Sequence, residues 1–263
     1  MQRMIARHLG ESALARVTPL AGLTGQSQAI ECAQGKFIAR PAPQPAIPFV
    51  DRQREYRLLN RLHAGGLTAK PLAGDRYGLL LAWQQGEAMK PEAFSLHVPQ
   101  IVALLRHLHQ QPLTGYRLKL LPLLWQYWQR CRQRNLPWLQ ALQRLTRIGE
   151  PSPLRLAPLH KDVHAGNIIV AHEGLHLIDW EYAADGDIAL ELAAVCAADP
   201  TQQLRWLTTY AQAAQLPFAQ LQRQVNHWQP WLRLLMASWY QLRAEQSGEK
   251  ALQQMARESW EQI

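Results

Sequence analysis

The sequence predicts an α+β fold with two lobes: a small antiparallel β lobe that contains one helix, and a larger, mostly helical lobe. Short apolar segments separated by glycines dominate the first part of the chain, as in strands joined by tight turns. From Pro99 onward, apolar residues recur every three or four positions, which is typical of helices. A hairpin pattern over residues 168–178 interrupts these helices. We therefore place the lobes at residues 1–84 and 85–263.

The first lobe is expected to begin with an amphipathic helix over residues 1–16. Its apolar side consists of Met4, Ile5, Leu9 and Leu14. Strands and glycine turns follow up to Pro41, and we expect Gly25 and Ser27 to bring backbone N–H groups to phosphate oxygens. The glycines match neither the P-loop pattern nor a full G-x-G-x-x-G, so an ordinary hairpin is the alternative.

Three further segments complete the first lobe and lead out of it. Residues 41–48 contain four prolines, which exclude regular structure and indicate a stiff connector. Residues 51–63 have helical apolar spacing, and Gly65 and Gly66 end that helix. Residues 76–89 predict the last strand of the lobe and a crossing into the second lobe at Gly86.

The second lobe is expected to be built from helices around the hairpin. Helical spacing covers residues 101–110, 120–134 and 136–149, and another helix is expected from Asp187 to Cys196. Aromatic residues at helical spacing continue through the last third of the chain, where they are typical of a packed core.

Composition limits the kind of protein this is. The chain has 263 residues, of which 48% are hydrophobic and 18% charged, and this is enough for a substantial core. The net charge of +8 and the pI near 9.7 favour anionic partners such as nucleotides. No dense run of lysine and arginine occurs, so we expect no nucleic-acid binding. We also expect a monomeric protein.

The cysteines and the first residues indicate the cellular compartment of the protein. Cys32, Cys131 and Cys196 are far apart and odd in number, which indicates free thiols in a reducing compartment. The N-terminal residues lack a signal-peptide core, and no stretch of about 18 apolar residues occurs. We expect a cytoplasmic protein without a membrane segment.

The segment from His160 to Glu191 carries the strongest chemical signal. Asp162 and Asn167 lie on a loop before an apolar strand, and Asp179 follows the second strand of the same hairpin. A single aspartate or asparagine in a loop is usually only a turn former. Turn formation does not explain why all three residues occur in this order with a strand between Asn167 and Asp179.

The residue types in this set suit phosphoryl transfer. An amide oxygen and a carboxylate are hard oxygen ligands, and with water and phosphate oxygens they form a typical Mg2+ site. A carboxylate is too weak a base to remove the proton of an alcohol beforehand. Asp162 is therefore expected to orient a substrate hydroxyl and accept its proton late, as a loose transition state permits. Positioning and charge neutralisation then supply most of the rate.

The pattern His160-x-Asp162-x-x-x-x-Asn167, followed by a strand and Asp179, resembles the aminoglycoside phosphotransferase and choline kinase superfamily, whose fold is protein-kinase-like. The resemblance implies ATP and Mg2+ as cofactors, with Asp162 as the catalytic residue. It also implies that Asn167 and Asp179 hold the metal and that His160 structures the loop. The segments PLHKDVHAGN, GLHLIDWEYAADGDIALELAAV and LLPLLWQYW are similar to bacterial members whose acceptor is thiamine, so the implied partners are thiamine and ATP.

The same resemblance assigns the nucleotide-binding residues. Arg40 occupies the position of the cation that binds nucleotide phosphates, and Glu55 is its expected ion-pair partner. The alternative is that Glu55 only neighbours Arg52 on an exposed helix face. Backbone groups from Leu81 to Trp83 are expected to contact the adenine edge.

A thiazolium cation would suit an aromatic face with nearby carboxylates. Trp180, Glu181, Asp185 and Asp187 are therefore expected to line the acceptor pocket. The sequence departs from the family pattern at two places: Lys161 stands where glycine is common, and Glu191 stands where aspartate is usual.

Three other functions stay open at this point. A kinase for choline or an aminoglycoside would share the catalytic loop, so only the acceptor distinguishes it. A non-catalytic binding module of the same fold is disfavoured by the intact Asp162, Asn167 and Asp179. A nucleic-acid-binding protein would show retention on heparin or DNA that does not depend on nucleotide.

Overall fold

The structure is a computed structural model that describes residues 1–20 and 27–263. It contains two compact units, each formed by two segments of the chain. The first unit contains residues 1–116 and 158–184, and the second contains residues 117–157 and 185–263. The lobe boundary expected at residue 84 does not coincide with a boundary of these units and stays a prediction.

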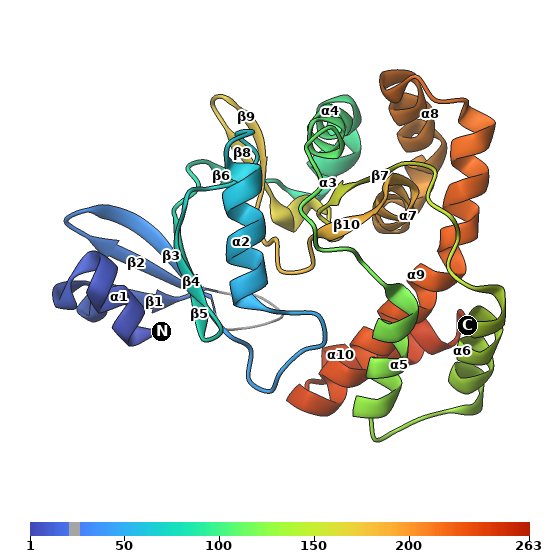
Figure 1. The fold of residues 1–263 in the computed structure, drawn as a ribbon, viewed down its shortest axis with the longest axis horizontal. Coiled ribbons are helices and arrows are strands. Elements are labelled where there is room, and N and C mark those ends of the chain that lie inside the picture. Colours follow the sequence, from blue (N-terminus) through green and yellow to red (C-terminus); the bar gives the residue numbers. More distant parts are fainter. Residues whose placement is uncertain (21–26) are drawn as a thin grey trace. The chain divides into compact units, whose positions relative to one another are not determined.

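The first unit is built on a five-stranded antiparallel sheet with the strand order β1-β2-β3-β5-β4 (Figure 1). The strands are β1 (Val17–Pro19), β2 (Gln28–Cys32), β3 (Gly35–Pro41), β4 (Pro71–Asp75) and β5 (Gly78–Ala82). In the centre of the sheet, Ile38 of β3 pairs with Leu81 of β5. The strands expected at residues 28–32 and 35–41, and the turn between them, are therefore confirmed. The first glycine turn that the sequence predicted lies outside the described residues.

Successive side chains of β3 point to opposite faces of the sheet, and the two faces have different surroundings. Phe37 and Ala39 point to one face, where they pack in a core with Ile5 and Leu9 of α1 (Gln2–Leu9). Arg40 follows Ala39 and so points to the opposite face. That face is covered by α2 (Arg52–His63), and the sheet thereby directs the Arg40 guanidinium towards this helix.

The N-terminal helix is shorter than expected. It ends at Leu9, because Gly10 adopts φ 84°, a left-handed conformation that interrupts an α-helix. A 3-10 helix, η1 (Glu11–Arg16), continues the chain, and Leu14 is exposed instead of packed with Ile5 and Leu9. The prediction of one helix over residues 1–16 was wrong at this glycine.

Helix α2 forms where the sequence predicted it. Asp51 caps its first turn by accepting a hydrogen bond from the Arg54 N–H at 3.0 Å. Leu58, Leu59 and Leu62 are buried on its inner side. Before α2, residues 42–51 form neither helix nor strand, as the prolines predicted for residues 42–48. The prediction was wrong at Pro41, which ends β3 and pairs with Gly78 of β5.

A second, three-stranded sheet in the same unit carries the hairpin. Its order is β6-β8-β9, formed by β6 (Glu87–Ala88), β8 (Ile168–Ala171) and β9 (Gly174–Leu177). The predicted hairpin is thus confirmed, and the turn before Gly174 joins its strands. The helical segments of this part are α3 (Pro91–Phe94), η2 (Ser95–His97), α4 (Val98–His109) and η3 (Ala165–Asn167).

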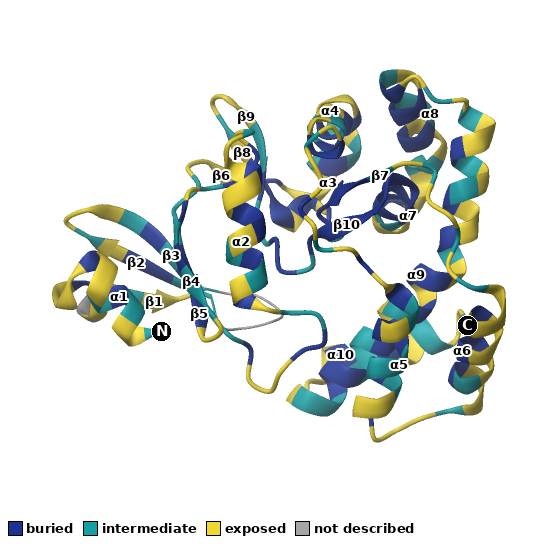
Figure 2. Ribbon diagram, in the orientation of Figure 1, coloured by how far each residue is buried: buried dark blue, intermediate teal, exposed yellow. Residues whose placement is uncertain are grey.

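The second unit is mainly helical. Its helices are α5 (Leu120–Arg130), α6 (Leu136–Ile148), α7 (Ile188–Ala198), η4 (Pro200–Gln202), α8 (Gln203–Ala214), α9 (Phe218–Ser247) and α10 (Lys250–Trp260). Figure 2 shows α7 mostly in the colour of buried residues, as its apolar sequence requires. The chain passes between the units within β7 (Leu156–Leu159) and β10 (Ala184–Asp187), which form a two-stranded sheet.

The predicted helices of this region are confirmed to within a few residues, including the one that begins after Asp187. Among residues 1–20 and 27–263, no helix combines the length and the apolar character needed to cross a bilayer.

Candidate active site

His160 anchors the loop that carries Asp162. Its side chain is fully buried, and its Nε2 lies 2.8 Å from the carbonyl oxygen of Ile178. Its Nδ1 accepts a hydrogen bond from the Asp162 N–H at 3.3 Å, which assigns the ring as the tautomer with a proton on Nε2. The ring also packs edge-on against Trp180 at 4.6 Å between centroids. His160 therefore connects the loop to the segment that contains Asp179.

Asn167 fixes Asp162 more directly. Its side-chain amide donates hydrogen bonds at 2.9 Å to both the backbone oxygen and the Oδ2 atom of Asp162. The backbone oxygen of Asn167 in turn accepts from the Ile178 N–H at 3.0 Å. Because the amide nitrogen faces Asp162, the Oδ1 atom of Asn167 is the atom left for a cation. Asp162 itself is only half-buried, as an oxygen that meets a substrate must be.

A buried ion cluster joins β3, α2 and the segment that follows β9. The Arg40 guanidinium donates to Glu55 at 2.9 Å, to Glu181 at 2.9 Å, and in a short contact to Asp179. The expected ion pair between Arg40 and Glu55 is therefore present. Arg40, Glu55 and Glu181 are each at most 5% exposed in their side chains, so water screens these charges little.

Arg52 is a further member of this cluster, which the sequence suggested only in an alternative that put it on an exposed helix face. Its side chain is 3% exposed and donates to Glu55 at 2.7 Å and to Glu181 at 3.0 Å. The alternative in which Glu55 and Arg52 share an exposed helix face was therefore wrong. The spacing in the sequence could have indicated this contact, because Arg52 precedes Glu55 by three residues and so lies on the same side of the helix.

The cluster shifts the pKa of its members in opposite directions. Burial alone would raise the pKa of Asp179, but its ion pair with Arg40 outweighs burial and holds that pKa below the ordinary value. Burial and the nearby Asp179 charge raise the pKa of Glu181. Burial would lower the pKa of Arg40, yet its three carboxylate partners hold it above the ordinary range.

The donor set fits Mg2+. Two guanidinium groups face three carboxylates, so the cluster holds one negative charge in excess. Asp179 and Asn167 add hard oxygen atoms on neighbouring ends of the hairpin. Both features favour a divalent cation at Asn167 and Asp179.

His164 lies beside Asp162 on the same loop. Its Nδ1 accepts from the Gly166 N–H at 3.1 Å, and its Nε2 lies 3.8 Å from the Asp162 Oδ1 atom. The close approach of the Asp162 carboxylate is the main cause that raises the pKa of His164. Neither contact was expected from the sequence.

The residues expected to bind the nucleotide are described only in part. Gly25 lies outside the described residues, and Ser27 lies directly before β2, where its backbone oxygen accepts from the Leu20 N–H. The N–H of Trp83 already donates to the Lys36 carbonyl at 3.0 Å. Leu81 pairs within the sheet. If this stretch contacts adenine, the donor is therefore not the Trp83 N–H.

The four residues expected around the acceptor are all buried. In the first unit, Trp180 donates its indole N–H to the Leu177 carbonyl, and Glu181 belongs to the ion cluster. In the second unit, Asp187 caps α7 and accepts from the side chains of Gln224 and Trp228. Asp185 is 2% exposed. Their assignment to an acceptor pocket stays a prediction.

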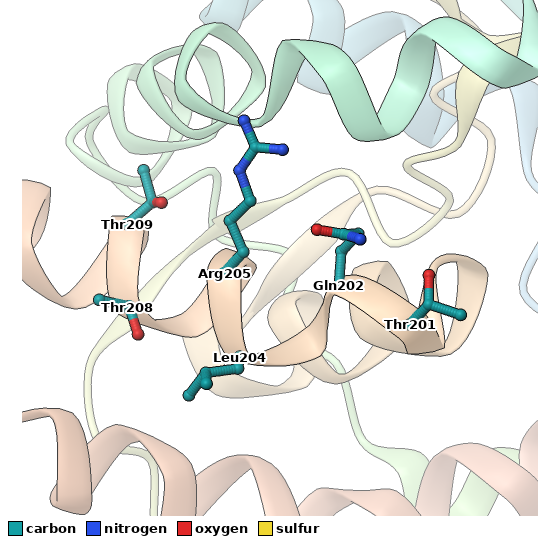
Figure 3. Close-up of a pocket in the computed structure, with 6 residues that line it drawn as sticks. All are labelled: Thr201, Gln202, Leu204, Arg205, Thr208 and Thr209. Carbon is teal, nitrogen blue, oxygen red and sulfur yellow. The ribbon is translucent and has the colours of Figure 1, made fainter.

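A surface hollow on η4 and α8 contains none of the predicted site residues (Figure 3). Its lining consists of Thr201, Gln202, Leu204, Arg205, Thr208 and Thr209. This lining has three threonines, a glutamine, an arginine and an exposed leucine but no carboxylate, so it does not resemble the loop at Asp162.

The fold and the loop define a phosphotransferase, and comparison with known proteins agrees. Residues 19–228 match the phosphotransferase enzyme family, so the chain belongs to this family. The chain is 42% identical over 247 residues to the thiamine kinase of Escherichia coli O9:H4 (strain HS), a match that covers 92% of this chain and 88% of that protein.

Solved structures show the same fold at low sequence identity. The choline kinase LicA from Streptococcus pneumoniae has a TM-score of 0.75 and 18% identity, with 100% of this chain and 99% of LicA covered. LicA in complex with AMP has a TM-score of 0.73 and 16% identity, with 93% of this chain and 90% of that chain covered. The kinase-like fold expected from the sequence is therefore confirmed.

Proposed function

We propose that this protein transfers the γ-phosphoryl group of MgATP to the hydroxyethyl group of thiamine, giving thiamine phosphate in thiamine salvage. The observation that carries this proposal is the 42% identity to a thiamine kinase over 92% of the chain. Hydrogen bonds of His160 and Asn167 that hold the loop around Asp162 in place support it further. The protein is an enzyme that phosphorylates an alcohol.

Each loop residue has a separate role in this reaction. Asp162 orients the thiamine hydroxyl and accepts its proton late in transfer. Asn167 holds the Asp162 carboxylate through its amide nitrogen and offers Oδ1 to the metal together with Asp179. When bound, Mg2+ neutralises charge on the transferring phosphates.

Arg40 is proposed to contact the nucleotide phosphates. Glu55 keeps its guanidinium in place at 2.9 Å, and a fully charged arginine inside a dry site interacts strongly with phosphate. ATP is supported by membership of the phosphotransferase family, and a choline kinase of the same fold was solved with AMP.

The remaining expectations concern the acceptor and the setting of the protein. Trp180, Glu181, Asp185 and Asp187 are proposed to line the thiamine pocket. Gly25, Ser27, Leu81 and Trp83 are proposed to contact the nucleotide. A monomeric state, a cytoplasmic location and the absence of nucleic-acid binding stay predictions.

The test is ADP release from MgATP with thiamine, choline, aminoglycosides and hydroxylated amino acids as acceptors. We expect release with thiamine and little with the others. Asp162→Ala and Asp179→Ala should each lower kcat by about 10²- to 10⁴-fold while circular dichroism stays native. Glu173→Gln is the matched control, because Glu173 is a 59% exposed carboxylate in the hairpin turn.

Two outcomes would contradict the proposal. Release with another acceptor in place of thiamine would keep the phosphotransferase and remove thiamine as its substrate. Full activity in Asp162→Ala would remove the catalytic role of that residue.

A further inference from the structure

The ring of Phe49 contacts two cations. The Arg54 guanidinium carbon lies 3.7 Å from the ring centroid, and the Lys161 ammonium nitrogen lies 4.2 Å from it. Both distances are within the range of a cation–π interaction. Phe49 stands at the end of the proline-rich connector, and Arg54 belongs to α2, whereas Lys161 belongs to the catalytic loop. One aromatic ring therefore joins two segments that are distant in the sequence.

Two of these residues have strained backbones. Phe49 has φ 71° and Lys161 has φ 70°, in the left-handed region that residues with a Cβ rarely adopt. A glycine at position 161 would adopt this conformation without strain, but it would bring no ammonium group to the ring. Such strain persists where surrounding contacts hold it, and it occurs often at functional sites. Here both strained residues meet in one contact.

The contact also reaches the segment that follows Asp179. Arg54, which contacts the ring, also donates a hydrogen bond of 2.8 Å to the backbone oxygen of Glu181. Lys161 lies between His160 and Asp162, so any movement of its backbone moves Asp162. The ring is thus connected through Lys161 to the Asp162 loop and through Arg54 to the Asp179 segment.

We propose that Phe49 is a positioning residue, whose ring holds Lys161 and so keeps the Asp162 loop in register with the Asp179 segment. This inference rests on the proposed function, because that function assigns the hydroxyl to Asp162. Phe49 acts through Lys161 and Arg54 and makes no direct contribution to the chemistry. None of the hydrogen bonds described above for Arg40, Asn167 and His160 involves Phe49.

The first experiment compares kcat and KM of four variants. Phe49→Leu removes the π face, Lys161→Met removes the charge, and each should lower kcat by about five- to twentyfold, with both KM values within about twofold of wild type. Phe49→Tyr keeps the ring and should retain kcat. The double variant Phe49→Leu/Lys161→Met should be no slower than the slower single variant, because both changes remove one contact.

A matched control removes another contact of the same kind. Tyr77 is 58% exposed, and the Arg76 guanidinium lies 4.7 Å from its ring. Tyr77→Leu should leave kcat and KM unchanged. A multiplicative loss in the double variant, or an equal loss in Phe49→Tyr, would show that Phe49 and Lys161 do not act through a shared contact.

The second experiment needs no turnover. Amide hydrogen exchange over residues 161–167 should be faster in Phe49→Leu and Lys161→Met than in wild type and Tyr77→Leu. The reason is that both variants remove the contact between the ring and Lys161 that restrains the loop. A wild-type protein inactive with thiamine would overturn the proposed function and leave this exchange test standing. An active wild type with unchanged kcat and unchanged exchange in both variants would overturn the role of Phe49.

Discussion

Arg40 illustrates how much one buried side chain can organise. Strand alternation turns it towards α2, and there it meets carboxylates from α2 and from the segment after β9. Removing an arginine from such a cluster leaves several buried carboxylates without a partner, which is costly. Its position is therefore set by the fold as a whole, and its charge serves both folding and the proposed phosphate contact.

The cysteines offer a residue-scale prediction. Burial raises the pKa of the Cys131 thiol to about 12, with Glu245 adding to the effect. Burial likewise raises the pKa of Cys196 to about 12. A thiol reacts as its thiolate, so neither should react with Ellman's reagent at pH 8. Cys32, which is partly exposed and free, should account for about one labelled thiol per native chain.

Unfolding provides the control for this measurement. In denaturant all three thiols should react. The raised pKa values also set a direction for stability: the neutral thiols favour folding below the unfolded pKa of about 8.5, and this contribution is lost as the pH rises towards 12. Fast native labelling of Cys131 or Cys196 would contradict the burial described for them.

At the scale of elements, α2 connects local sequence to the site. Asp51 starts the helix, and within its first turn the helix presents Arg52 and Glu55 on the side that faces Arg40. The helix start thus fixes the position of two members of the ion cluster. The hairpin β8–β9 plays the same part for Asn167 and Asp179, which flank its two strands.

The cap of α2 can be tested by substitution. Asp51→Ala should lower the free energy of unfolding by about 1 kcal/mol, because the Arg54 N–H loses its acceptor. Asp51→Asn keeps an acceptor and should cost much less. Chemical denaturation of both variants beside wild type measures the difference. Equal losses for alanine and asparagine would show that the charge of Asp51, not the cap, carries the effect.

At the scale of the whole molecule, the net charge of +8 is distributed unevenly. The ion cluster is locally negative, since it has three carboxylates for two arginines. A basic protein with an acidic ion cluster suits the joint binding of a polyanionic nucleotide and a divalent cation. The excess negative charge of the cluster attracts the cation, and the bound cation compensates the negative charge of the nucleotide phosphates.

Ligand binding should therefore stabilise the chain only when both components are present. At about 100 times its dissociation constant, MgADP should add about 2.7 kcal/mol to the free energy of unfolding. For a chain of this size that corresponds to a rise of roughly 5–10 °C in Tm. The Asp179→Asn variant should lose the part of this Tm rise that depends on magnesium. Scanning fluorimetry with ADP alone and with ADP plus magnesium measures that part.

The control for this shift is Glu173→Gln, which should keep the full response because Glu173 lies in the exposed hairpin turn. An equal shift with and without magnesium in wild type would contradict the assignment of Asn167 and Asp179 as metal ligands.

Local sequence determined most of the elements and the identity of the catalytic loop. Apolar periodicity located the hairpin and the helices, and the spacing of Asp162, Asn167 and Asp179 singled out phosphoryl transfer, since these patterns depend on neighbouring residues alone. Gly10 was one exception among the described elements, because a single left-handed residue ended a helix that the apolar pattern continued.

Only the tertiary structure decided which side chains share the site. Arg52 lies in the ion cluster, and Phe49 lies between Arg54 and Lys161, because separate segments fold onto one another. Sequence periodicity assigns a residue to a side of its own element, but burial and partner depend on what covers that side. The same reason explains why a charged residue such as Glu181, predicted for the acceptor, is found paired with two arginines.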